Sequence, residues 1–65
     1  MREAYRVYAD GRRDSGHSGL VDACTTARRA AFDRPGVEFE VVRSSDYEVE
    51  GTWSVSAGKL RAWVR

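Results

Sequence analysis

The residues with the chemistry of a nucleophilic site lie together in one short stretch, residues 14–18. It holds Asp14, Ser15, Ser18 and His17, and histidine is the side chain that most often serves as a general base near neutral pH. Catalysis also requires a third group that orients the base, and a pocket that excludes water. Four neighbours on one exposed loop seldom supply both, so we expect no catalytic residues and no enzymatic activity.

Extended back to Gly11, the same stretch has the glycine spacing of a phosphate-binding loop, followed by His17 and Ser18. A nucleotide-hydrolysing loop has lysine before the hydroxyl residue, because lysine reaches the β- and γ-phosphates while the hydroxyl holds magnesium. Here histidine replaces that lysine, and the chain is too short for the parallel sheet that normally carries such a loop. We therefore exclude nucleotide hydrolysis.

A weaker interpretation of this region is a site for an anion. Free backbone N–H groups at the start of a helix can hold a phosphate or carboxylate, and basic residues stand nearby in the sequence. The candidate anion-binding residues are Arg12, Arg13, Ser15, Gly16, Ser18, Arg28 and Arg29. A polar loop with an ordinary helix cap is the simpler interpretation, and we favour it.

Composition argues against several classes of function. The formal net charge of +1 gives no bulk attraction to nucleic acid. A single cysteine, Cys24, excludes an internal disulfide and is expected to be a small core residue, and no cysteine–histidine set exists to hold zinc. We expect no metal and no cofactor. Nothing in the sequence has the pattern of a signal peptide or a membrane span, so a cytoplasmic protein is expected.

The basic residues are almost all arginine, and isoleucine, asparagine and glutamine are absent. Isoleucine, asparagine and lysine have AT-rich codons, so a GC-rich genome explains their shortage without reference to function. This composition is typical of small accessory proteins of GC-rich bacteria and their phages.

One long segment, from Ser18 to Arg34, has the period of an amphipathic helix. Ser18 is a good N-cap, and Pro35 and Gly36 are residues that end helices. The apolar residues of the segment are small, which would allow its backbone to approach a sheet closely. They are Leu20, Ala23, Cys24, Ala27, Ala30 and Ala31.

Four segments alternate between apolar and polar residues with the period of half-buried strands, namely residues 3–9, 37–43, 47–55 and 60–64. Asp10-Gly11 is a strong turn signal, but no apolar alternation follows it, so we predict a loop for residues 10–17. If residues 44–46 form a three-residue loop, Val41 pairs with Val49, and the apolar residues of both strands stay on one face of the sheet. A two-residue loop at 57–58 pairs Val55 with Leu60, Trp53 with Ala62 and Gly51 with Val64.

These elements predict a single small α+β domain over residues 1–65, with the order β-α-β-β-β and one helix packed on a mostly antiparallel four-stranded sheet. A right-handed crossover would place the first strand parallel to the second, in the order 1-2-3-4. Insertion of the first strand beside the last is the alternative. A chain this short has a modest core and no disulfide, so we expect self-association, most simply as a homodimer.

The sheet face away from the helix carries side chains that a monomer would leave exposed: Tyr8, Val42 and Trp63, with Arg61 beside them. Aromatic residues on a sheet can stack on unpaired bases or bury in a protein interface, where Tyr, Trp and Arg are enriched. The same face would hold four glutamates, which repel nucleic acid, so a protein partner is favoured. They are Glu38, Glu40, Glu48 and Glu50.

The sequence therefore predicts a small, non-enzymatic protein-interaction module that forms a homodimer and binds a protein partner. The predicted interface is the surface around Tyr8, Val42, Arg61 and Trp63, or an edge strand. Anion or nucleic-acid binding through the basic loop and the helix side is the alternative function. No contact with a membrane is expected.

Overall fold

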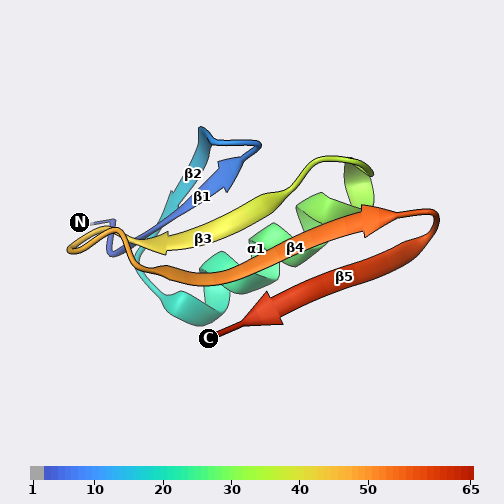
Figure 1. The fold of residues 1–65 in the computed structure, drawn as a ribbon. Coiled ribbons are helices and arrows are strands. Elements are labelled where there is room, and N and C mark those ends of the chain that lie inside the picture. The colour runs from blue at the N-terminus through green and yellow to red at the C-terminus, as the bar shows by residue number, and fades with distance from the viewer. Residues whose placement is uncertain (1–2) are drawn as a thin grey trace.

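The alternating segments form one antiparallel sheet in the computed structural model, which describes residues 3–65 (Figure 1). The helix α1 (Leu20–Asp33) lies across one face of that sheet, so the predicted α+β class is confirmed. The sheet has five strands, in the order β2-β1-β3-β4-β5, rather than the four predicted. They are β1 (Tyr5–Ala9), β2 (Arg12–His17), β3 (Phe39–Arg43), β4 (Val49–Ser56) and β5 (Lys59–Val64).

Residues 12–17 form strand β2, so the prediction of a loop over residues 10–17 is wrong. Asp10 and Gly11 both have positive φ angles, 48° and 82°, as the primed turn of a two-residue hairpin requires. The turn signal was therefore correct and the strand after it was missed. Strand β2 lacks apolar alternation because it is an edge strand whose helix-side residues, Ser15 and His17, are polar.

Strand β2 also reverses the predicted direction of the first strand. It returns the chain along β1 before the helix begins, so the crossover through α1 joins β2 to β3 on either side of β1. Strand β1 is consequently antiparallel to β3, and the prediction of a parallel pair is wrong. The predicted neighbour is correct, and insertion beside the last strand is excluded.

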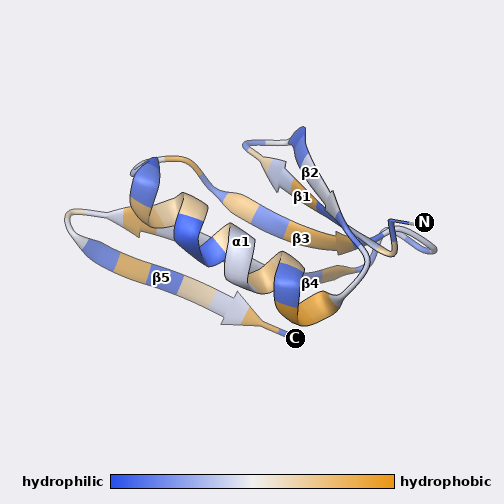
Figure 2. Cartoon of the chain, turned by 180° about the vertical axis from the view of Figure 1, so that it is seen from behind, coloured by the Kyte–Doolittle hydropathy of each residue, from blue (hydrophilic) through white to orange (hydrophobic). Residues whose placement is uncertain are grey.

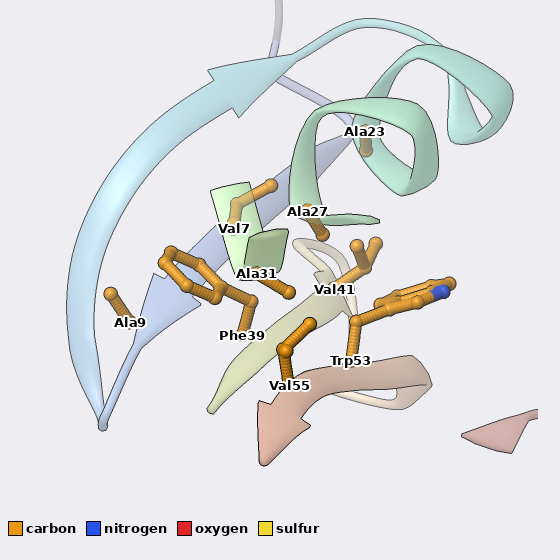
Figure 3. Packing of buried hydrophobic residues seen from close by; sticks show 9 residues of the cluster. All are labelled: Val7, Ala9, Ala23, Ala27, Ala31, Phe39, Val41, Trp53 and Val55. Carbon is orange, nitrogen blue, oxygen red and sulfur yellow. The ribbon is translucent and has the colours of Figure 1, made fainter. Parts of the chain in front are cut away.

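The core rests on a stripe of alanines along α1. Ala23, Ala27 and Ala31 are fully buried and lie four residues apart, which places them on one side of the helix. Because each side chain ends at Cβ, the helix backbone can lie close to the sheet. Figure 3 shows the sheet residues that pack beneath them, which are Val7, Ala9, Phe39, Val41, Trp53 and Val55.

The helix begins slightly later than predicted. Gly19 is the N-cap residue, with an extended backbone and no side-chain cap, so Ser18 does not cap the helix. At the other end α1 stops before Pro35, as predicted, and Gly36 has a φ of 89°. The chain then turns back toward the sheet, where the Gly36 N–H donates to the Val55 carbonyl at 2.9 Å.

The predicted pairing of Val41 with Val49 is wrong. Val41 pairs with Gly51 and Val42 with Val49, so Glu50 is an extra residue in β4, which forms a β-bulge. The bulge turns Glu50 to the helix side, where its carboxylate lies 3.7 Å from Arg43 Nε. Glu50 therefore does not belong to the acidic outer face that the sequence predicted.

The β4–β5 hairpin follows the predicted register. Val55 pairs with Leu60, Trp53 with Ala62 and Gly51 with Val64. These three pairs lie on the helix side of the sheet and alternate with pairs on the outer face. The two turn residues, at positions 57 and 58, have φ angles of 51° and 75°, which again fits a primed turn. Strand β5 is thereby fixed as a regular edge strand of the sheet.

Gly51 fits where no larger residue would. A Cβ atom built on it would lie 2.5 Å from Cη2 of Trp53 and 3.0 Å from the Trp63 carbonyl oxygen. We expect Gly51→Ala to lower the free energy of unfolding by about 1–3 kcal/mol, because the buried Trp53 ring must shift. Urea denaturation followed by tryptophan fluorescence measures this change.

The control is Gly19→Ser, since a Cβ atom at Gly19 meets nothing within 4 Å and serine is a good N-cap. We expect that variant to be at least as stable as the parent. If Gly51→Ala were equally stable, the close packing of the Trp53 ring over Gly51 would be contradicted.

Candidate functional site

The sheet face away from α1 carries a shallow hollow of about 260 Å³. Val42 and Val49 form a cross-strand pair there, with Val42 only 6% exposed, and Tyr47 is 68% exposed beside them. The residues that line the hollow come from β1, the β1–β2 turn, β3, β4 and the β3–β4 connection. They are Tyr8, Gly11, Glu40, Val42, Tyr47 and Val49.

A cation lies beside the tyrosines on this face. Arg6 pairs across β1 and β3 with Val42, and a hydrogen bond with Tyr8 raises the pKa of Arg6, with a smaller contribution from Tyr47. The Glu3 carboxylate lies 3.7 Å from Arg6 Nε. Arginine is charged at any physiological pH. Arg6 therefore presents a cation next to two tyrosines, a combination that is enriched in protein interfaces.

The four predicted interface residues share the outer face but form two separate pairs. Tyr8 and Val42 meet at the hollow, but Val42 is already buried within the single chain, so the prediction that a monomer leaves it exposed is wrong. Arg61 and Trp63 lie on β5, with β4 between them and β3. Two strand spacings, roughly 10 Å, separate β3 from β5. Trp63 stands opposite Thr52 as predicted and is 52% exposed.

Strand β5 is the least covered part of the sheet. Helix α1 packs against β1, β2, β3 and β4, and in Figure 2 it lies in front of β4 while β5 runs clear of it at one side. On the helix side of β5, Leu60 contacts the core, but Ala62 is exposed and Val64 is 64% exposed. The sequence placed these residues inward correctly but did not reveal that Ala62 and Val64 remain uncovered.

The predicted anion-binding residues are dispersed over the molecule. Arg12 and Arg13 begin strand β2, and the five residue steps from Arg12 to its end at His17 span roughly 16 Å, so both lie far from the helix start. Arg13 is already paired with Glu3, whose side chain also fills the space above Gly16. Neither arginine meets the free N–H groups of α1.

The helix arginines do not join them. The Arg28 guanidinium lies 5.5 Å from the centre of the Phe32 ring, in a cation–π contact on the helix surface. Arg29, one residue on, projects about 100° further around the helix. Ser15 is bonded to His17, and Ser18 precedes the N-cap residue. The structure therefore does not bring this predicted set together.

The nucleophile cluster has a partner that sequence reasoning missed. Ser15 Oγ lies 2.8 Å from His17 Nε2, and His17 Nδ1 lies 2.6 Å from Asp22 Oδ2. These are the contacts of a Ser-His-Asp triad, in which one ring nitrogen of the histidine faces the serine and the other faces the aspartate. The acid is Asp22, in the first turn of α1, rather than Asp14, which faces Arg34 at 3.4 Å.

A triad catalyses acyl transfer only when donors face the developing oxyanion and a pocket encloses the substrate. The hollow beside Tyr8 and a second one of about 550 Å³ beside Tyr5 do not include Ser15 or His17. The His17 side chain is 11% exposed, between strand and helix. We therefore interpret Ser15, His17 and Asp22 as a strand–helix tie, which fastens β2 to α1.

The single cysteine has no reactive character. Cys24 is half-buried against the core, and burial raises the pKa of its thiol, with a further contribution from the charge of Glu50. The neutral thiol is a poor nucleophile and a poor metal ligand. Among residues 3–65, no group of three or more His, Cys, Asp or Glu side chains is placed to hold a metal ion.

Neither a protein-family model, nor a curated protein, nor a solved structure matches the chain. In the part of the chain that the structure describes, no helix has the length and apolar character needed to cross a membrane. Any functional proposal therefore rests on the surfaces of this molecule, namely the hollow beside Tyr8 and the uncovered strand β5.

The strand–helix tie predicts an energetic coupling between its two elements. In a double-mutant cycle, His17→Ala and Asp22→Ala should show a coupling of about 0.5–1.5 kcal/mol in the free energy of unfolding, the usual contribution of one hydrogen bond. Urea denaturation of the four proteins measures it. As a control, His17→Ala and Asp33→Ala should be additive, since Asp33 ends the helix far from His17.

A catalytic role would appear differently. If Ser15 were a working nucleophile, an activated ester such as p-nitrophenyl acetate would give a burst of product that Ser15→Ala abolishes. Such a burst, together with additive behaviour of His17 and Asp22 in unfolding, would contradict the interpretation as a strand–helix tie.

Proposed function

We propose that this chain is a small, non-enzymatic protein-interaction module of a GC-rich bacterium or its phage, and that it self-associates. The observation that carries the proposal is the exposure of strand β5. Trp63 is 52% exposed on one face and Val64 is 64% exposed on the other, within a domain that buries few large side chains. Exposed apolar residues along a free strand edge are typical of surfaces that bind another protein chain.

The two edges of the sheet differ in a way that supports this location. Strand β2 has a bulge, and its helix-side residues Ser15 and His17 are polar, so this edge tolerates water. Strand β5 has no bulge and no proline, and its helix-side residues Leu60, Ala62 and Val64 are apolar. Bulges and polar inward residues protect an edge from pairing, and β5 lacks both devices.

The outer hollow is the surface that we assign to a second protein partner. Tyr8 and Tyr47 stand beside the charged Arg6, above the apolar pair of Val42 and Val49. Tyrosine and arginine supply much of the binding energy of protein interfaces, because each combines apolar area with hydrogen-bonding groups. Dimerisation through β5 leaves this hollow free.

Binding of single-stranded nucleic acid is the second candidate, and the structure gives it one supporting observation. The bulge removes Glu50 from the outer face, and Glu48 is paired with Arg65 at 3.1 Å, so fewer free carboxylates remain there than the sequence predicted. The exposed rings of Tyr47 and Trp63 could then stack on unpaired bases.

Self-association has a direct test. Light scattering over a dilution series should give twice the 7.3 kDa mass of one chain at high concentration. Trp63→Ala should shift dissociation to a concentration roughly tenfold higher or more, because an exposed aromatic at an interface centre is a strong contributor. Tyr47→Ala removes an aromatic ring that is even more exposed but lies away from β5, so it should leave the measured mass of the dimer unchanged. A monomer at every concentration would contradict the proposal.

The second candidate has a separate test. Fluorescence anisotropy with labelled single-stranded DNA and RNA, at low and at physiological salt, measures binding directly. Nucleic-acid binding through the outer face requires salt-dependent affinity that Tyr47→Ala weakens. Because the protein interface is our leading proposal, we expect no binding to either oligonucleotide, and tight, salt-sensitive binding would reverse the order of the two candidates.

A further inference from the structure

We propose that the partner of strand β5 is a second copy of this chain, joined by antiparallel pairing of the two β5 strands centred on Ala62. This inference rests on the proposed self-association and specifies its interface. It makes one continuous ten-stranded sheet from two molecules, related by a twofold axis perpendicular to the sheet. Both helices then lie on the same side of that sheet.

The direction of the backbone groups of β5 limits how it can pair. The N–H of Arg65 donates to the carbonyl of Glu50 in β4 at 2.9 Å. Backbone groups of alternate residues in an antiparallel strand point to opposite edges, so Arg61 and Trp63 also bond to β4. The N–H and C=O groups of Leu60, Ala62 and Val64 therefore point to the free edge.

Only one twofold register uses all three of these residues against one another. When Ala62 lies opposite Ala62 of the second copy, Leu60 lies opposite Val64, and each such pair exchanges two backbone hydrogen bonds. A register centred on Arg61 moves Val64 opposite Gly58, and one centred on Trp63 leaves Leu60 beyond the end of the partner strand. The Ala62 register therefore satisfies the most backbone groups between the two β5 strands.

The side chains of the outer face select the same register. It places Arg61 of one copy directly opposite Trp63 of the other, twice, in a cation–π arrangement. The register centred on Arg61 would oppose Arg61 to itself, and the one centred on Trp63 would oppose Arg61 to Arg65, with like charges in both cases. In the Ala62 register the only basic pair is Lys59 with Arg65, whose charge is already offset by Glu48 at 3.1 Å.

The helix side of the sheet gains cover from the same arrangement. Leu60, Ala62 and Val64 from both copies form one apolar strip between the two helices. A stable interface buries roughly 1,200–2,000 Å² in total, more than a six-residue strand edge supplies by itself. The exposed surfaces of Val64 and Trp63 must therefore be part of the contact, which matches their exposure in the single chain.

Engineered cysteines test the register. In a Cys24→Ser background, Ala62→Cys should form a disulfide-linked dimer on mild oxidation, because residue 62 meets its own copy at a Cα separation of about 5.5 Å. Leu60→Cys or Val64→Cys alone should not cross-link, since each would be offset from its own copy by four residues, roughly 13 Å. Mixing those two variants should restore the cross-link, between the two different chains.

A second variant separates this interface from self-association in general. The N–H of Ala62 makes no bond within one chain, so Ala62→Pro should leave the circular dichroism spectrum unchanged while raising the dimer dissociation constant by roughly tenfold or more. Cross-linking of Val64→Cys alone, or a dimer that survives Ala62→Pro, would overturn the β5 pairing while leaving self-association intact. A wild-type protein that is monomeric by light scattering would remove both proposals.

Discussion

A single helix has to cover a five-stranded sheet, and the other features of the molecule depend on this constraint. A helix with its side chains is about 10–12 Å across, whereas five strands spaced about 4.8 Å apart extend over roughly 19 Å. The alanine stripe of Ala23, Ala27 and Ala31 brings α1 close enough to bury Phe39 and Trp53 beneath it. That close approach makes the core dense. One helix is nevertheless narrower than the sheet, so it cannot cover both edge strands.

The two edge strands meet this shortage in opposite ways. Strand β2 turns polar side chains toward the helix side, and the contact from His17 to Asp22 fastens it to the start of α1. Strand β5 turns apolar side chains to the same side, and Val64 remains exposed there. Polar side chains at an edge can remain in contact with water, whereas an apolar edge gains stability when a second chain covers it. The difference between the edges thus connects the shape of the core to the proposed function.

The helix, four strands and the β4–β5 register could be predicted because each has a strong local signal: helical period, alternation, or a tight turn of fixed length. Strand β2 could not, since its polar residues on both faces leave only the turn at Asp10-Gly11 as a sign of it. The β3–β4 register failed because a bulge at Glu50 breaks the parity on which the prediction relied. The contact of His17 with Asp22 joins two elements, and the spacing of residues within one loop cannot reveal it.

Amide hydrogen exchange in strand β5, followed residue by residue by NMR, tests the claim that a second copy covers this edge. The amides of Arg61 and Trp63 point to β4 and should be protected at any concentration. Those of Leu60, Ala62 and Val64 should be protected where the protein is a dimer and should lose that protection on dilution. Fast exchange of these three amides in the dimer would contradict the account.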